Sequence, residues 1–158
     1  TTALTGVANR MITRRHRIGA LAVAAFAARP AFGAPTAVFA SSGYAIGGYD
    51  PVSYFRNESP AMGSDAHRLI WRKAIWRFQN AANMAAFEGA PRAFAPRFGG
   101  YCAMSLTVGA WSDSHPHAWA IHNDRLFLTH STAARDRWLT DPERHIALAE
   151  AHWRAAHW

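Results

Sequence analysis

Apolar and polar residues alternate along residues 67–78, which is the pattern of a β-hairpin with one buried face. A turn at Lys73–Ala74 places Trp71 opposite Trp76 on that face. The turn lacks the glycine or asparagine that two-residue hairpin turns prefer. The residues expected on the buried face are Leu69, Trp71, Trp76 and Phe78.

A second hairpin is predicted over residues 119–128, where Asn123–Asp124 supplies the turn. Its register sets two pairs of apolar residues against each other, Ile121 with Leu126 and Trp119 with Leu128.

Short helices are predicted before, between and after the hairpins. Asp50–Pro51 is a helix start, because aspartate caps free N–H groups and proline suits the first helical position. The same pair recurs at Asp141–Pro142 and opens a final helix. The other helices are expected at residues 52–55, 80–88 and 132–139. Hairpins that alternate with helices indicate an α+β fold, a small single domain of antiparallel β-hairpins packed against short helices.

The charge of the chain is concentrated near its N-terminus. Five arginines and no acidic residue precede residue 35, so that the formal net charge of +7 falls to +2 (7 − 5) over the rest of the 158 residues. A nucleic-acid-binding protein carries its basic excess on the folded part, so no nucleic-acid partner is expected.

The same N-terminal region has the pattern of a secretory signal: a basic segment at residues 13–17, an apolar run at Ile18–Ala28 and small residues after it. We expect an N-terminal extension and signal peptide at residues 1–34, a linker at 35–43 and the folded domain at 44–158.

This signal predicts a periplasmic protein. The apolar run is shorter than the roughly 20 residues that span a bilayer, so no stable membrane insertion is expected after signal removal. Thr13, Arg14, Arg15 and Ile18 match the twin-arginine export pattern, whereas Arg17 stands where an apolar residue is usual. The twin-arginine and general export routes therefore both stay open.

Three segments carry a resemblance to a known family. Ala45–Phe55 looks like a GYDPVAYF opening, Phe98–Ala103 like a YGGYCA centre, and Trp119–Leu128, followed by Trp138 and Trp153, like a closing segment. Together they resemble the YHS domain family in its longer, exported form. The resemblance implies the small α+β fold and a link to heavy metals, because YHS domains accompany copper-transport and metal-dependent proteins. Residues 111–117 differ from the family pattern, so their histidines take no role from it.

Metal-binding chemistry is expected around the single cysteine, Cys102. A thiolate is a soft ligand suited to Cu(I) or Zn²⁺. If residues 102–106 are extended, Met104 lies on the same face as Cys102 and adds a thioether. His115 and His117 share one side of a second extended segment. The expected ligands are therefore Cys102, Met104, His115 and His117, with Cu(I) as the expected ion.

Other interpretations of these residues stay open. Cys102 is also the kind of small apolar residue that cores bury, and the two histidines also suit an exposed loop. The sequence has no Ser-His-Asp order, paired carboxylates or repeated cysteine spacing, so a non-enzymatic binding module is expected, with a metal ion and another periplasmic protein as partners. The alternative is a protein-interaction or small-ligand-binding module with a structural cysteine.

Overall fold

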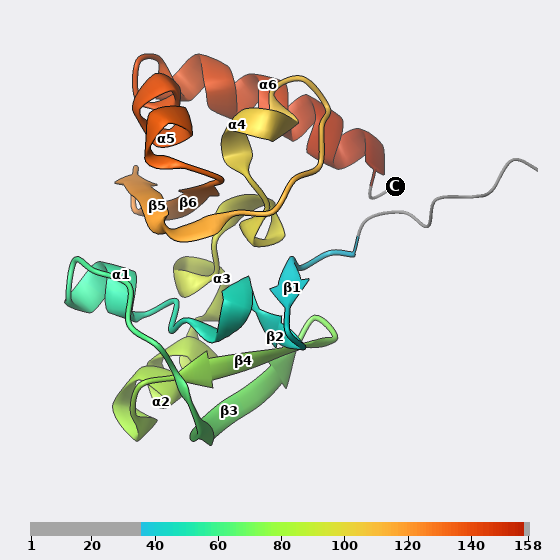
Figure 1. Ribbon diagram of the computed structural model, residues 1–158. Coiled ribbons are helices and arrows are strands. Elements are labelled where there is room, and N and C mark those ends of the chain that lie inside the picture. Colours follow the sequence, from blue (N-terminus) through green and yellow to red (C-terminus); the bar gives the residue numbers. More distant parts are fainter. Residues whose placement is uncertain (1–35, 157–158) are drawn as a thin grey trace, which may run out of the picture. The chain divides into compact units, whose positions relative to one another are not determined.

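The computed structural model describes residues 36–156 (Figure 1). The signal peptide expected at residues 1–34 lies outside this range. The elements follow in the order β1 (Ala40–Ser41), β2 (Tyr44–Ala45), η1 (Ile46–Gly48), α1 (Ser53–Arg56), β3 (Ser64–Trp71), β4 (Ala74–Phe78), α2 (Ala81–Gly89), α3 (Pro91–Phe94), η2 (Arg97–Gly100), α4 (Ala103–Leu106), β5 (His115–His122), β6 (Arg125–Thr129), α5 (Thr132–Trp138) and α6 (Pro142–Ala156).

Two β-sheets organise these residues, and the predicted α+β class is confirmed (Figure 1). The four-stranded sheet has the order β1-β2-β4-β3, in which β2 runs parallel to β4 and the other pairs are antiparallel. Strands β5 and β6 form a separate antiparallel sheet. Helix α2 packs on the β3–β4 hairpin, α4 and α5 contact β6, and α6 packs on α4. Within residues 36–156, no helix has the length and apolar character needed to cross a bilayer.

The turn of the β3–β4 hairpin lies one residue earlier than predicted. Trp71 pairs with Ala74, so the turn is Arg72–Lys73 and the expected Lys73–Ala74 turn is wrong. Arg72 and Lys73 have φ values of 50° and 62°, a left-handed conformation that Asn and Gly adopt more easily. The sequence did not favour this turn because neither residue type suits it.

The inner face of this hairpin carries the predicted side chains, because moving a two-residue turn by one position changes the strand pairing by two residues and keeps each side chain on its face. Leu69 and Trp71 on this face are only partly buried. Trp76 and Phe78 are 0% exposed, whereas Ile70 on the other face is 75% exposed.

Strand β3 is an edge strand. Its pairing with β4 shifts register between Ser64 and Arg68, a β-bulge or similar irregularity.

The β5–β6 hairpin has the predicted register. Ile121 pairs with Leu126 and Trp119 with Leu128, on either side of an Asn123–Asp124 turn. Both turn residues have positive φ, 48° and 55°, which asparagine and aspartate tolerate better than most residues.

The predicted helices are present, and side-chain caps explain where α2 and α6 begin. The Asn80 side chain accepts a hydrogen bond of 2.9 Å from the Asn83 N–H and starts α2. The Asp141 carboxylate accepts one of 3.3 Å from the Arg144 N–H at the start of α6.

Helix α1 begins at Ser53, two residues after Pro51, and no side chain caps it. The helix start predicted at Asp50–Pro51 is therefore wrong in detail.

Residues 36–43, which belong to the segment expected as a linker, pack against the rest of the described chain. Val38 and Phe39 are 4% and 8% exposed, and the Phe39 N–H donates to the Gly99 carbonyl at 2.9 Å. Gly99 has φ 61°, and a Cβ atom there would lie 2.2 Å from the Ala37 carbonyl oxygen. The chain therefore packs too closely at this point for a larger residue.

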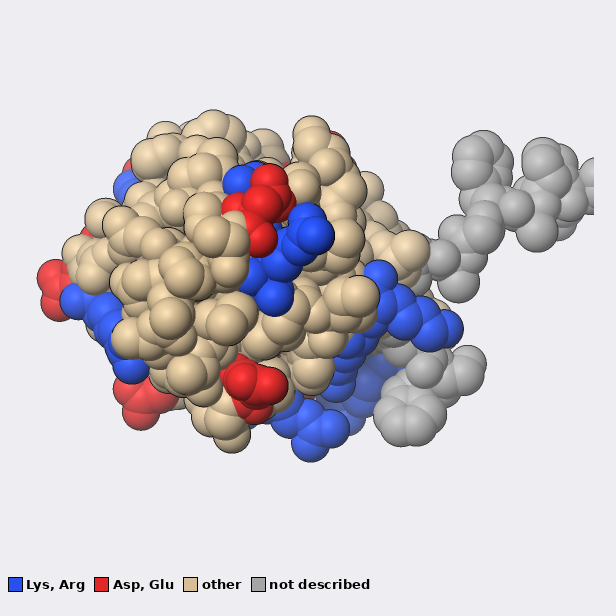
Figure 2. Space-filling model, turned by 90° about the horizontal axis from the view of Figure 1, so that it is seen from below, with Lys and Arg blue, Asp and Glu red and all other residues tan. Residues whose placement is uncertain are grey.

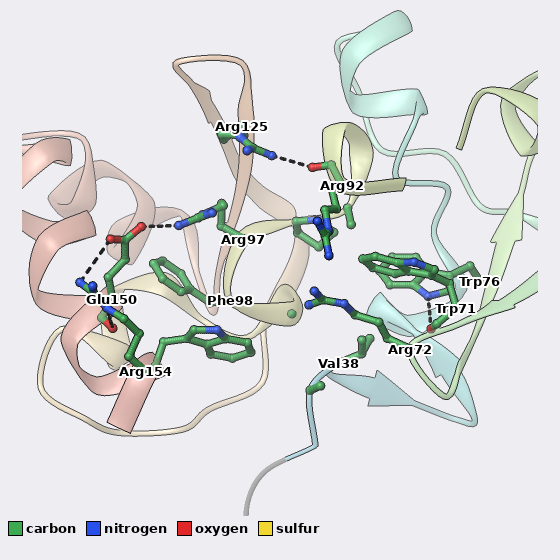
Figure 3. Close-up of a pocket in the computed structure, with 15 residues that line it drawn as sticks. Val38, Trp71, Arg72, Trp76, Arg92, Arg97, Phe98, Arg125, Glu150 and Arg154 are labelled. Atoms are coloured by element: carbon green, nitrogen blue, oxygen red, sulfur yellow. Dashed lines mark hydrogen bonds and ion pairs between the residues drawn. The ribbon is translucent and has the colours of Figure 1, made fainter. Parts of the chain in front are cut away.

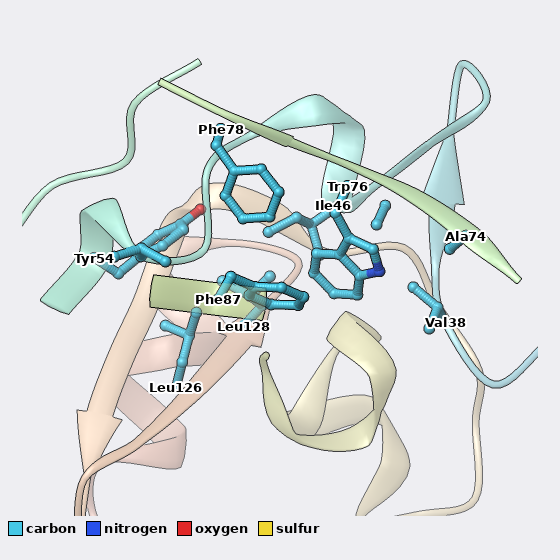
Figure 4. Close-up of a cluster of buried hydrophobic side chains, with 11 residues drawn as sticks. Val38, Ile46, Tyr54, Ala74, Trp76, Phe78, Phe87, Leu126 and Leu128 are labelled. Atoms are coloured by element: carbon cyan, nitrogen blue, oxygen red, sulfur yellow. The ribbon is translucent and has the colours of Figure 1, made fainter. Parts of the chain in front are cut away.

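Strand β6 lies between two hydrophobic clusters. Leu126 and Leu128 belong to the first cluster, which includes Trp76 and is shown in Figure 4. Phe127 belongs to the second, where its ring lies 4.6 Å from that of Trp138. Because strand side chains alternate in direction, β6 contributes to both clusters at once.

A buried carboxylate joins three segments beneath the first cluster. Asp50 is 0% exposed and accepts hydrogen bonds from Val52 N (2.8 Å), Gln79 N (2.9 Å) and Asn83 Nδ2 (2.6 Å). The Asn83 amide oxygen in turn accepts a bond of 2.8 Å from the Arg56 guanidinium. The negative charge is thus held by N–H donors and linked through Asn83 to a cation.

We expect Asp50→Ala to lower the free energy of unfolding by about 3 kcal/mol or more, because it removes the acceptor of three hydrogen bonds, two of them buried. Denaturant unfolding followed by tryptophan fluorescence measures this change. Asp136→Ala is the matched control, since this exposed carboxylate pairs only with its neighbour Arg135, and we expect a change within about 0.5 kcal/mol. Equal stability of the two variants would contradict the prediction.

The buried Tyr54 predicts a loss of stability at alkaline pH. Its hydroxyl donates to the Pro116 carbonyl at 3.1 Å, and burial, with smaller effects of Tyr49 and Asp50, raises the pKa of Tyr54 well above its usual value. The neutral phenol therefore contributes its full stabilisation below about pH 10, the pKa of tyrosine in the unfolded chain. Above this pH the free energy of unfolding falls by about 1.4 kcal/mol per pH unit.

We expect Tyr54→Phe to cost about 1 kcal/mol near neutral pH through the lost hydrogen bond, and to unfold with a shallower pH dependence above about pH 10. Unfolding free energies measured up to about pH 11 test this. Parallel pH curves for the two proteins would show that Tyr54 does not titrate with unfolding.

Candidate functional site

Cys102 occupies the N-cap position of α4. Its sulfur accepts a hydrogen bond of 3.4 Å from the Ser105 N–H, and its own N–H donates to the Ser112 carbonyl at 3.0 Å. Cys102 also forms an isolated parallel bridge with Leu128 in β6. The backbone on both sides of the thiol is therefore fixed by strand and helix contacts.

The sulfur of Cys102 lies beside a histidine. Cys102 is 0% exposed, and its Sγ lies 3.2 Å from the Nδ1 atom of His130. The backbone N–H of His130 also donates to this sulfur at 3.3 Å. A soft sulfur and an imidazole nitrogen thus lie within hydrogen-bond distance, and either ring tautomer can serve this contact.

The position of His130 follows from the end of β6. It comes directly after the buried Thr129, whose hydroxyl lies 3.0 Å from the carbonyl oxygens of both Ala118 and Ser131. Ser131 then caps α5 through a bond from the Ala134 N–H. Since the residues on both sides are fixed, the His130 backbone is held against Cys102.

His130 connects this buried sulfur with the surface. His130 is exposed, whereas Cys102 is fully buried. A small ion can therefore reach the imidazole from solvent, whereas the sulfur beside it has no contact with solvent in this structure.

The expected placement of Met104 beside Cys102 requires an extended backbone at residues 102–106, and the structure has a helix there instead. Residues 103–106 form α4, so alternation along a strand does not apply to them. Met104 is partly buried and packs against the second hydrophobic cluster.

His115 and His117 lie together on β5, as expected from their spacing. Both are exposed, their ring centroids are 5.7 Å apart, and the His117 N–H donates to His115 Nδ1 at 3.2 Å. The His117 ring also makes an edge contact with Tyr49.

In the part of the chain that the structure describes, no three His, Cys, Asp or Glu side chains are grouped so as to hold a metal ion. Cys102, His115 and His117 therefore do not form one centre. The structure instead brings together Cys102 and His130, a residue that the sequence analysis missed. The two are 28 residues apart in the sequence and are joined through a strand bridge, which no periodicity or motif spacing indicates.

No protein-family model, curated protein or solved structure matches this chain, so the geometry of its own residues carries the functional argument.

Proposed function

We propose that this protein is a binding module for a soft metal ion, Cu(I), held by Cys102 and His130. From the sequence pattern, we further propose that the module is exported and of the YHS type. The observation that carries the metal proposal is the distance of 3.2 Å between Cys102 Sγ and His130 Nδ1.

The pair of ligands favours Cu(I) over zinc. Thiolate sulfur is a soft ligand that suits Cu(I), and imidazole binds copper as well. Structural zinc sites require four ligands, whereas Cu(I) accepts a lower coordination number.

The geometry also indicates how the ion is accommodated. With metal–sulfur and metal–nitrogen distances of about 2.3 Å and 2.0 Å, two atoms 3.2 Å apart hold an ion only at an angle near 95°. A wider angle requires the exposed His130 ring to swing outward, while the buried sulfur stays in place. The backbone N–H groups of Ser105 and His130 can still donate to the sulfur when it is the metal-bound thiolate.

A structural role for Cys102 is the rival interpretation. Its full burial and its bond from Ser105 N–H suit a residue that only caps α4. A purely structural cysteine does not require an imidazole nitrogen at 3.2 Å, and this contact favours the metal proposal.

Titration with Cu(I) against a competing chelator tests the site. We expect Cys102→Ser and His130→Ala each to weaken Cu(I) binding by more than about tenfold, since even residues outside the ligand set change metal affinity by about 10–100-fold. His115→Ala/His117→Ala is the matched control, because it removes two exposed imidazoles outside the pair, and we expect unchanged affinity.

His130 is exposed, so its replacement is expected to leave the fold intact, and circular dichroism checks this for every variant. Natural affinity in both Cys102→Ser and His130→Ala would overturn the proposal. A loss only in the double histidine variant would place the metal on β5 instead.

The contact between the exposed His130 ring and the buried sulfur gives a second prediction, in which the ring limits access to the thiol. We expect iodoacetamide to modify Cys102 slowly in the natural protein, faster in His130→Ala, and more slowly again when Cu(I) is bound. Mass spectrometry over time measures the rates, and the unfolded protein supplies the rate of a free thiol. Equal rates for the natural protein and His130→Ala would show that the ring does not control access.

A further inference from the structure

A cavity of about 510 Å³ lies away from Cys102 and is lined by five arginines (Figure 3). Its volume is within the range of about 300–1,000 Å³ that is usual for small-molecule sites. The arginines come from five different segments: the β3–β4 turn, α3, η2, β6 and α6. They are Arg72, Arg92, Arg97, Arg125 and Arg154.

This concentration of positive charge is unusual for the chain. Five of the 17 Lys and Arg residues precede residue 35, and five of the remaining twelve line this one cavity. A single acidic residue, Glu150, lines it with them. On the face seen in Figure 2, the largest group of basic side chains lies at the lower right, and others lie at the left and in the centre beside acidic ones.

Glu150 neutralises only part of this charge. It forms ion pairs with Arg97 and Arg154. Arg72 and Arg92 have no carboxylate within ion-pair distance among residues 36–156, and Figure 3 shows both side chains reaching into the cavity. Arg125 donates instead to the Arg92 carbonyl, at 2.6 Å. Guanidinium groups that line one cavity repel one another, and an anion bound among them reduces this repulsion.

Aromatic rings form the walls of the cavity. Trp71 is partly exposed and lies on one side, with the Arg72 guanidinium 4.8 Å from its ring centroid. Trp76 packs against Trp71 and is itself fully buried, so it supports this wall without exposing its own surface to the cavity. Phe98 and Trp153 lie on the other side, with ring centroids 6.0 Å apart. Flat apolar walls beside guanidinium groups suit a planar molecule with a charged substituent.

The β3–β4 turn positions Arg72. Arg72 and Lys73 both have positive φ, as the two central residues of a tight hairpin turn require. This turn holds the Arg72 guanidinium over Trp71, at the edge of the cavity.

We propose that this cavity binds a small planar organic anion, with its aromatic body between the tryptophan and phenylalanine walls and its phosphate or carboxylate group on Arg72 and Arg92. Both oxyanions match the planar fork of a guanidinium group. This site is separate from the metal pair and does not depend on it.

Isothermal titration calorimetry with four probes tests the ligand class: 1-naphthyl phosphate, 1-naphthoate, neutral 1-naphthalenemethanol and inorganic phosphate. We expect at least one naphthyl anion to bind about tenfold or more tightly than both the neutral alcohol and inorganic phosphate. Only the naphthyl anions can contact the aromatic walls and the guanidinium groups at the same time. The stronger of the two anions identifies the oxyanion that the site prefers. Equal binding of the alcohol, or binding of no probe, overturns the proposal.

Arg72→Gln/Arg92→Gln tests the residues. Glutamine keeps much of the side-chain length and removes the charge, and we expect the affinity for the naphthyl anion to fall about tenfold or more. Arg135→Gln/Arg144→Gln is the matched control, because it removes two charges from α5 and α6 outside the cavity. Natural affinity in the first variant, or an equal loss in the control, overturns the assignment to this cavity.

Discussion

The burial of β6 on both faces is the constraint on which the rest of the structure depends. Leu126 and Leu128 pack into one hydrophobic cluster while Phe127, between them, packs into the other. The strand therefore fixes the two clusters to each other and leaves little freedom in its own position. Because Cys102 bridges to Leu128 and His130 follows the strand, this packing also sets the distance between the sulfur and the imidazole.

One short segment serves both proposed binding places. Residues 97–102 contribute Arg97 and Phe98 to the arginine-lined cavity and then reach Cys102. The backbone between them turns through positive φ at Phe98, Gly99 and Gly100 and packs closely on its neighbours. This closely packed turn therefore places residues of both proposed binding places within six positions of the sequence.

The sequence predicted those parts of the fold that local physics determines. The Asn123–Asp124 turn has residues that tolerate positive φ, and its register was predicted correctly, whereas the Arg72–Lys73 turn has none and was placed one residue late. Of the two residues in the proposed metal site, the sequence indicated only Cys102. Its partner His130 is reached through a strand bridge between residues far apart in the sequence, and α4 is too short to show a helical period. Family membership and export stay predictions from the sequence.

The irregular pairing in β3 bears on how molecules of this protein behave toward one another. An edge strand presents unpaired N–H and C=O groups, and Ile70 adds an exposed apolar side chain to this one. The register shift between Ser64 and Arg68 breaks the even spacing that a second molecule would need in order to extend the sheet. Asp65 and Arg68 place opposite charges on the same stretch. The edge is thereby protected against intermolecular strand pairing and the aggregation that follows from it.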